Sequence, residues 1–156
     1  MKASLGRSLG GNARDKTLQG AQRAPYLLAA LCTIAAGLAI RLVPLGLTYS
    51  IVKYGGSTIW GAMVYALVAA CAPSARICTA FLVSVIIAAL SEFFRLYHTP
   101  ELDAFRMTLA GALLLGRVFS VWNIVAYSVG IALAALADTA FRRARVRPRD
   151  LSTALP

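Results

Sequence analysis

Residues 77–97 read ICTAFLVSVIIAALSEFFRLY, and this stretch decides the fold. Its only charged residues, Glu92 and Arg95, lie near its end. An α-helix needs about 20 predominantly apolar residues to cross the hydrocarbon core of a bilayer. We therefore predict a transmembrane helix here, with Arg76 at its cytoplasmic start. Three further stretches have the same character, which predicts a protein folded in lipid.

The composition of the whole chain supports this prediction. Hydrophobic residues make up 59% of the 156 residues and charged residues only 14%, whereas soluble domains average about 25% charged residues. We predict an all-α membrane protein, a four-helix transmembrane bundle with an additional short helix. The transmembrane domain is expected over residues 24–140, and Tyr54-Gly55-Gly56 is expected to lead into its second span. The spans are predicted at about 26–48, 59–73, 77–97 and 120–138.

Basic residues gather at the two ends of the chain. Ten of the sixteen lysines and arginines precede the first span or follow the last. The excess of Lys and Arg in cytoplasmic segments then predicts that both termini are cytoplasmic and that the number of crossings is even. We expect residues 1–23 to form a disordered basic arm and residues 141–156 a basic tail. The net charge of +10 does not indicate nucleic-acid binding, because it is concentrated at these ends.

The segment 100–116 is predicted to be a short helix that does not cross the membrane. Thr99-Pro100-Glu101 is typical of a helix start, with proline at the first position and an acid in the first turn. The uncharged part, residues 107–116, is too short for a span. We therefore expect a re-entrant or interfacial helix on the outer side. A crossing here would place the basic tail outside, against the charge asymmetry.

Residues that bind metals or perform nucleophilic catalysis are sparse. Cys32, Cys71 and Cys78 lie in apolar stretches without C-x-x-C spacing, so we expect small core residues rather than a disulfide or zinc site. His98 has no second ligand at metal spacing. The serines and glycines lack the motifs of nucleophile elbows and phosphate-binding loops. We predict no metal, no cofactor and no catalytic residue.

Ionisable residues in or near the membrane are the first candidates for function, because a central charge costs about 2.5 to 3.5 kcal/mol on insertion scales. Glu92 and Arg95 lie three residues apart on one helical face, where they can neutralise each other. Asp103 and Arg106 repeat this spacing on the next segment. Two interpretations remain open: these residues bind a ligand, or the pairs only fasten helix ends.

Aromatic side chains cluster near the predicted span ends, as is typical of the lipid–water boundary. Most are expected to be anchors. With the predicted topology, several share the outer surface with the two ionic pairs, so we expect a polar, aromatic-rimmed pocket there. Its candidate ligand-binding residues are Glu92, Arg95, Asp103, Arg106, Asn123, Tyr127, Tyr54 and Trp60.

Three stretches together resemble one family of small bacterial membrane proteins. They are YGGSTIW at residues 54–60, SEFFRLY at 91–97 and GRVFSVWNIVAYSVG at 116–130, and the linking stretch PELDAFRMT at 100–108 fits as well. In this order they are similar to the domain-of-unknown-function 2809 (DUF2809) family, over about residues 24–140. The motif around Glu92 also resembles the VanZ-like proteins, more distantly. The resemblance implies a multi-pass protein of the bacterial inner membrane and supplies no activity.

The chain departs from the DUF2809 pattern at two positions. That pattern usually has Asp where this chain has Ser57 and Asn123, so two carboxylates are missing. If the acids of the family handle protons or cations, this member has lost that chemistry or performs it with Glu92 and Asp103 alone.

Three functions fit these observations. The first is a non-enzymatic accessory or envelope factor, whose outward-facing polar pocket binds a lipid headgroup or a partner protein. The second is a small transporter or channel, which four short helices would form only as an oligomer. The third is a membrane enzyme on lipid-linked substrates, with Glu92 or Asp103 as acid or base. The lipid bilayer is the expected partner in each case, and a membrane-protein partner or a second copy stays open.

Overall fold

The computed structural model describes the backbone of residues 2–44, 46, 48–108, 110–111, 115–116 and 118–152, and the side chains among these from residue 20 to residue 145. All the described regular structure is helical. The helices are α1 (Lys2–Leu42), α2 (Tyr49–Cys71), α3 (Ile77–Phe94), α4 (Pro100–Met107) and α6 (Val121–Ser152). This confirms the predicted all-α fold with a short additional helix.

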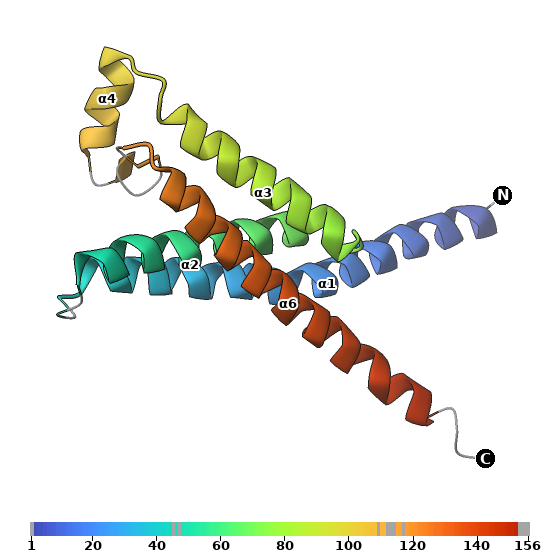
Figure 1. Cartoon of the computed structure of the whole chain (residues 1–156). Coiled ribbons are helices and arrows are strands. Elements are labelled where there is room, and N and C mark those ends of the chain that lie inside the picture. Colours follow the sequence, from blue (N-terminus) through green and yellow to red (C-terminus); the bar gives the residue numbers. More distant parts are fainter. Residues whose placement is uncertain are drawn as a thin grey trace.

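Four of the described helices are long and apolar enough to cross a membrane, over Gly20–Leu42, Tyr49–Cys71, Ile77–Phe94 and Val121–Arg145. Helix α2 is central, because its backbone packs closely against those of α1, α3 and α6, whereas among the described helices α1 packs closely only against α2 and reaches α6 through the Tyr26 side chain. Figure 1 shows α1 and α2 side by side, with α6 crossing them and α3 beside α6. The result is one four-helix bundle.

The two ends of this bundle differ. We call the end where α1 and α3 finish and where α2 and α6 begin the distal end, and α4 lies there (Figure 1). The opposite, proximal end holds the connection of residues 72–76 and the side from which α1 starts and toward which α6 runs. The proximal end therefore lies on the same side as the two basic termini.

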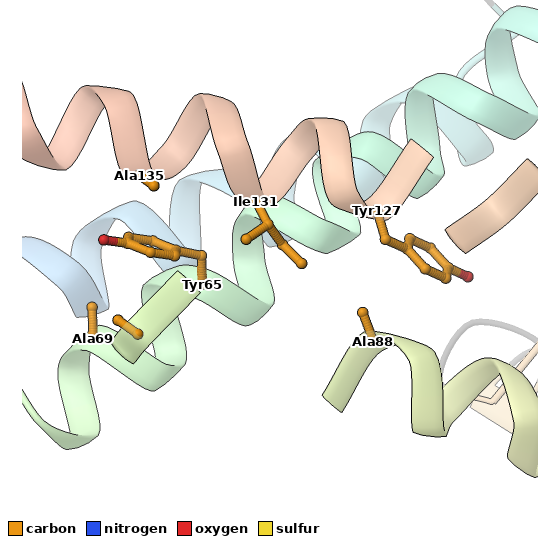
Figure 2. Packing of buried hydrophobic residues seen from close by; sticks show 7 residues of the cluster. Tyr65, Ala69, Ala88, Tyr127, Ile131 and Ala135 are labelled. Carbon is orange, nitrogen blue, oxygen red and sulfur yellow. The ribbon is translucent and has the colours of Figure 1, made fainter. Parts of the chain in front are cut away.

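Alanines, with two tyrosines and one isoleucine, make up the core between the helices, and large apolar side chains cover the outside. The core contains Tyr65, Ala69, Ala88, Tyr127, Ile131 and Ala135 (Figure 2). Leu31, Ile86 and Leu133 are more than half exposed, at 63%, 57% and 56%. Small residues let helix backbones approach closely where lipid removes the hydrophobic drive for association. The pattern fits a bundle that is surrounded by lipid.

The three cysteines correct one expectation. Cys32, Cys71 and Cys78 are all exposed, so the prediction that they are core residues is wrong. Their apolar neighbours in the sequence do not distinguish core from surface, because the outside of a membrane helix is as apolar as its inside.

Helix α2 starts ten residues before the expected span of 59–73, and the glycine pair lies inside it rather than before it. The reason is the contact with α1. A Cβ at Gly55 would meet the Ile40 side chain at 3.4 Å, and one at Gly56 would lie 3.2 Å from Arg41 Nε. The glycines mark a close helix–helix approach, and sequence reasoning interpreted them as a helix start.

The other boundaries also differ from expectation. Helix α1 begins at Lys2, where a disordered arm of 1–23 was expected, and it ends at Leu42 rather than near residue 48. Helix α6 continues from the span through the basic tail to Ser152. Once a membrane span has nucleated a helix, extending it costs little free energy, because each added residue gains one hydrogen bond.

The helix in the segment 100–116 begins as expected. The Thr99 side chain accepts a hydrogen bond from the Leu102 N–H, and α4 ends at Met107. Residues 109 and 112–114 of that segment lie outside the described residues.

Candidate functional site

Glu92 is the centre of a polar cluster at the distal end. Its side chain is completely buried near the end of α3. Four groups donate hydrogen bonds to its carboxylate: the Arg95 guanidinium at 3.0 Å, the Ser120 backbone N–H at 2.7 Å, the Asn123 amide at 3.1 Å and the Tyr127 hydroxyl at 3.0 Å. A buried charge is tolerated when it is paired and hydrogen-bonded in this way. The carboxylate is therefore fully engaged by the protein itself.

Arg95 ties this carboxylate to the segment that precedes α6. Besides Glu92, it donates to the Leu115 carbonyl at 2.8 Å, to the Val118 carbonyl at 3.4 Å and to the Tyr127 hydroxyl at 2.8 Å. Gly116 permits this approach, because its φ is +69° and a Cβ there would lie 2.6 Å from Arg95 Cζ. A guanidinium has five N–H groups, so within the described residues one Nη2 hydrogen is left for a further acceptor.

Asn123 and Ser57 extend the cluster from α6 onto α2. Both side chains are buried. Because the Asn123 amide donates to Glu92, its oxygen faces the Ser57 hydroxyl, 3.5 Å away. That hydroxyl also lies 3.0 Å from the Lys53 carbonyl, one turn earlier in α2. The cluster thus links α2, α3 and α6.

A cavity of about 390 Å³ opens beside this cluster, and we call it the distal cavity. The rings of Trp60 and Tyr127, with centroids 4.7 Å apart, form part of its wall. Its polar lining consists of Arg41, Lys53, Ser57, Arg95, Ser120 and Asn123. This volume falls in the range of small-molecule pockets, about 300 to 1,000 Å³.

Positive charge is in excess in the distal cavity. Arg41, Lys53 and Arg95 line it, and only Arg95 forms an ion pair among the described residues. The four spans hold only two acidic residues, Glu92 and Asp138. Glu92 neutralises Arg95, and Asp138 lies in another cluster at the proximal end. Arg41 and Lys53 therefore line the cavity without a carboxylate partner among the residues that the structure describes.

Asp103 and Arg106 form a separate cluster and do not line the distal cavity. Arg106 is buried, and it donates to the carbonyls of Phe94 and Tyr97 at 3.0 and 2.9 Å, which satisfies the C-terminal end of α3. It also bonds Asp103 at 3.1 Å, and His98 lies 3.0 Å from the same carboxylate. The hydrogen bond with His98, aided by Arg106, holds the pKa of Asp103 below its usual value. The cluster fastens α4 to α3.

The eight candidate residues thus separate into three groups. Glu92, Arg95, Asn123 and Tyr127 meet in one network, and Trp60 lines the same cavity. Asp103 and Arg106 belong to the α4 cluster. Tyr54 lies apart, on a surface with Trp122 and Val125, which are both exposed.

The candidate residues predicted from the sequence did not include Arg41, Lys53, Ser57 or Ser120. A signal for two of them was present. With a helix start at Tyr49, Lys53 and Ser57 lie four residues apart and share one helical face. This relation was missed because the glycine pair was interpreted as preceding the helix, which placed Lys53 and Ser57 outside it.

A second buried carboxylate, Asp138 of α6, was also missed. It accepts hydrogen bonds from the hydroxyls of Tyr26 on α1 and Tyr65 on α2, each at 2.8 Å, and from Arg142 at 3.1 Å. Arg142 also bonds the Ala75 carbonyl at 3.0 Å. The cluster joins α1, α2, α6 and the connection of residues 72–76. The spacing of Asp138 and Arg142, four apart on one helix, was the available signal.

Comparison with known proteins gives one family and no solved structure. The family described as "Protein of unknown function (DUF2809)" matches residues 47–131. The match supports the DUF2809 resemblance and does not bear on the VanZ-like one. The matched stretch contains Glu92, Arg95, Asn123 and Tyr127, and it excludes Arg41 and Asp138. No solved structure matches the chain.

Proposed function

Since the chain belongs to the family described as a protein of unknown function (DUF2809), and that description assigns no activity, we propose a function from the distal cavity: the chain is a non-enzymatic membrane protein that binds the anionic headgroup of a lipid. One observation carries the proposal. Arg41 and Lys53 line the cavity and have no carboxylate partner among the described residues.

The positions of these two cations suit a headgroup. Arg41 lies in the last turn of α1 and Lys53 in the first turns of α2, so both are at the distal membrane boundary rather than at its centre. Basic side chains at this level attract anionic lipids by about 1 kcal/mol each. The basic termini support a distal end that faces outward, because positive segments remain in the cytoplasm. The expected ligand is therefore a lipid of the outer leaflet.

A binding role fits the chemistry better than catalysis. A general base needs a free position from which to accept a proton, and Glu92 already accepts four hydrogen bonds. A transport role is disfavoured for a single chain, because buried Tyr65, Tyr127 and Ile131 fill the core between the distal cavity and the Asp138 cluster. The enzyme and transporter alternatives therefore rank below binding.

The proposal is tested with lipid mixtures. The purified protein, in nanodiscs of phosphatidylcholine with or without phosphatidylglycerol, is melted and its Tm is measured. We expect phosphatidylglycerol to raise Tm, because a ligand that binds only the folded state stabilises it. The variant with both Arg41→Gln and Lys53→Gln is expected to lose most of this rise.

A matched variant controls for the loss of charge. Arg76 and Arg143 are exposed and belong to the proximal half of the bundle, so Arg76→Gln with Arg143→Gln removes the same charge away from the cavity. It is expected to keep the rise in Tm. An equal loss in both double variants would contradict the proposal, since it would show a response to overall charge alone.

A further inference from the structure

An apolar groove between α1 and α2 adjoins the distal cavity. This groove, which we call the α1–α2 groove, has a volume of about 190 Å³ and shares Arg41 and Trp60 with the cavity. Beyond these two residues its lining is almost entirely apolar: Ile34, Gly37 and Leu38 on α1, and Ile59 and Met63 on α2, with Thr33 at its far end. The Thr33 hydroxyl donates its hydrogen bond to the Ala29 and Ala30 carbonyls of its own helix. The lining thus changes from cationic in the distal cavity to apolar in the α1–α2 groove, and Arg41 and Trp60 mark the boundary between them.

The groove runs in the direction that the acyl chain of a lipid takes, from the membrane surface toward the bilayer interior. Its α1 lining runs from Arg41 back to Thr33, eight residues or about 12 Å along the helix. Because α1 is a candidate membrane span, the groove leads from the headgroup level toward the bilayer interior. Gly37 leaves room in its wall, since a Cβ there would first meet Ile59 Cγ2 at 3.5 Å.

We propose that the ligand is an anionic phospholipid, whose phosphate lies at Arg41 and Lys53 and one of whose acyl chains lies in the α1–α2 groove. This inference rests on the proposed function and names the molecule that the site takes. A free anion would use the cations and leave the adjoining groove unexplained. A neutral lipid would fill the groove and leave the two cations without a partner. Only an amphiphile with a negative head matches both parts.

Trp60 provides a direct probe, because it lies where the cavity and the groove meet. The chain has one other tryptophan, Trp122, which is 68% exposed and lies on another surface. In a Trp122→Phe background the fluorescence of Trp60 is therefore measured alone. Phosphatidylglycerol with brominated acyl chains is titrated as a minor component into phosphatidylcholine nanodiscs, and brominated phosphatidylcholine is titrated in parallel into unbrominated membranes.

We expect brominated phosphatidylglycerol to quench Trp60 in a saturable manner, at several-fold lower mole fraction than brominated phosphatidylcholine. Gly37→Leu fills the groove and should remove the saturable quenching, whereas Gly37→Ala adds one methyl at ordinary contact distance and should retain it. Soluble glycerol 3-phosphate should compete only weakly, because it lacks the chain. Its binding should be equal in Gly37→Leu and in the wild type.

The outcomes separate this inference from the proposed function. If phosphatidylglycerol still raises Tm through Arg41 and Lys53 but Gly37→Leu leaves quenching unchanged, the headgroup binds and the chain stays in the bulk bilayer, which overturns the inference alone. If glycerol 3-phosphate competes as well as the lipid, the ligand is a free anion and the inference is again wrong. If Arg41→Gln with Lys53→Gln changes neither Tm nor quenching, the proposed function itself fails.

Discussion

At the scale of single residues, the two carboxylates of the spans act as connectors. Glu92 joins α3 to the segment before α6 and to α6 itself, and Asp138 joins α6 to α1 and α2. Each is buried, and each is paired with an arginine three or four residues further along the chain. Arg41 and Lys53 at the distal cavity have no carboxylate partner in the described part of the chain, so they are available for an anionic ligand.

Glu92→Gln is expected to destabilise the protein by about 3 kcal/mol, because removal of one partner leaves the Arg95 charge uncompensated in a buried site. The measurement is the free energy of unfolding from SDS titration in mixed micelles. Adding Arg95→Met should recover part of the loss. Glu101→Gln, at an exposed acid of α4, is the control and should change stability little. A Glu92→Gln protein as stable as the control would show that the pair is not structural.

Gly116→Ala is expected to disturb the same cluster through the backbone. The chain offers a matched control, because Gly46 and Gly116 both have positive φ, 65° and 69°, but among the described residues only a Cβ at Gly116 would have neighbours within 4 Å. Gly46→Ala should cost about 1 to 2 kcal/mol, the left-handed penalty alone. Gly116→Ala should cost clearly more in the same SDS titration, because it also displaces Arg95. Equal costs would show that the Arg95 contacts contribute little.

How much of the site the sequence reveals depends on the kind of residue. Glu92 and Arg95 were predictable as a pair, because charges in an apolar span are rare and their spacing of three fixes their relation. The convergence of Asn123 and Tyr127 on Glu92 was expected only as a shared surface. Asp103 and Arg106 look the same in sequence as Glu92 and Arg95, and only tertiary structure shows that they cap α3 instead of lining the cavity. Lys53 was hidden by an error in a helix boundary.

At the scale of helices, the crossing of α2 and α6 depends on two glycines. A Cβ at Gly61 would lie 2.8 Å from Tyr127 Cα, and one at Gly130 would collide with the Thr58 carbonyl. Because small residues permit such backbone contact in membranes, the crossing point is fixed by these positions. The hydroxyl of Tyr127 is consequently held where it reaches Glu92 and Arg95.

Gly61→Ala and Gly130→Ala are each expected to lower stability by about 1 to 3 kcal/mol, as overpacked contacts do. Gly20→Ala is the control, since no atom of the described residues lies within 4 Å of a Cβ there and alanine favours a helix over glycine. It should leave stability unchanged or raise it. The melting temperatures of the three variants are measured in one detergent. A decrease for Gly20→Ala as large as for the other two variants would refute the packing explanation.

The existence of the four spans was predictable, and their ends were not. Apolar length identifies a span, because it reflects the thickness of the bilayer. The ends depend on local contacts. Gly55 and Gly56 continue α2 because they lie against Ile40 and Arg41. At the other extreme, Thr99 and Pro100 begin α4 as the sequence predicts, since capping acts through neighbours in the chain.

At the scale of the whole molecule, the number of spans agrees with the distribution of charge. Four candidate spans place the two chain ends on one side, and ten basic residues lie at those ends. On the positive-inside rule we propose that the proximal end faces the cytoplasm. The distal cavity would face outward, where the proposed lipid resides.

Cysteine labelling tests this orientation. In a background with Cys32, Cys71 and Cys78 replaced by alanine, Glu101→Cys is expected to react with an impermeant maleimide in intact cells. Arg143→Cys, at the opposite side of the membrane, is expected to react only after the cells are opened. The reverse pattern would place the distal cavity in the cytoplasm and would contradict an outer-leaflet ligand.

The central position of α2 has a consequence for biogenesis. Of the four candidate spans it is the least apolar, and it also has the largest buried share. Its stable residence in the bilayer therefore depends on its neighbours more than on its own partition into lipid. Helix α6, which covers its glycine face, is synthesised last. Until then α2, the least apolar of the candidate spans, is incompletely covered in the nascent chain, so we expect its stable insertion to depend on the later synthesis of α6.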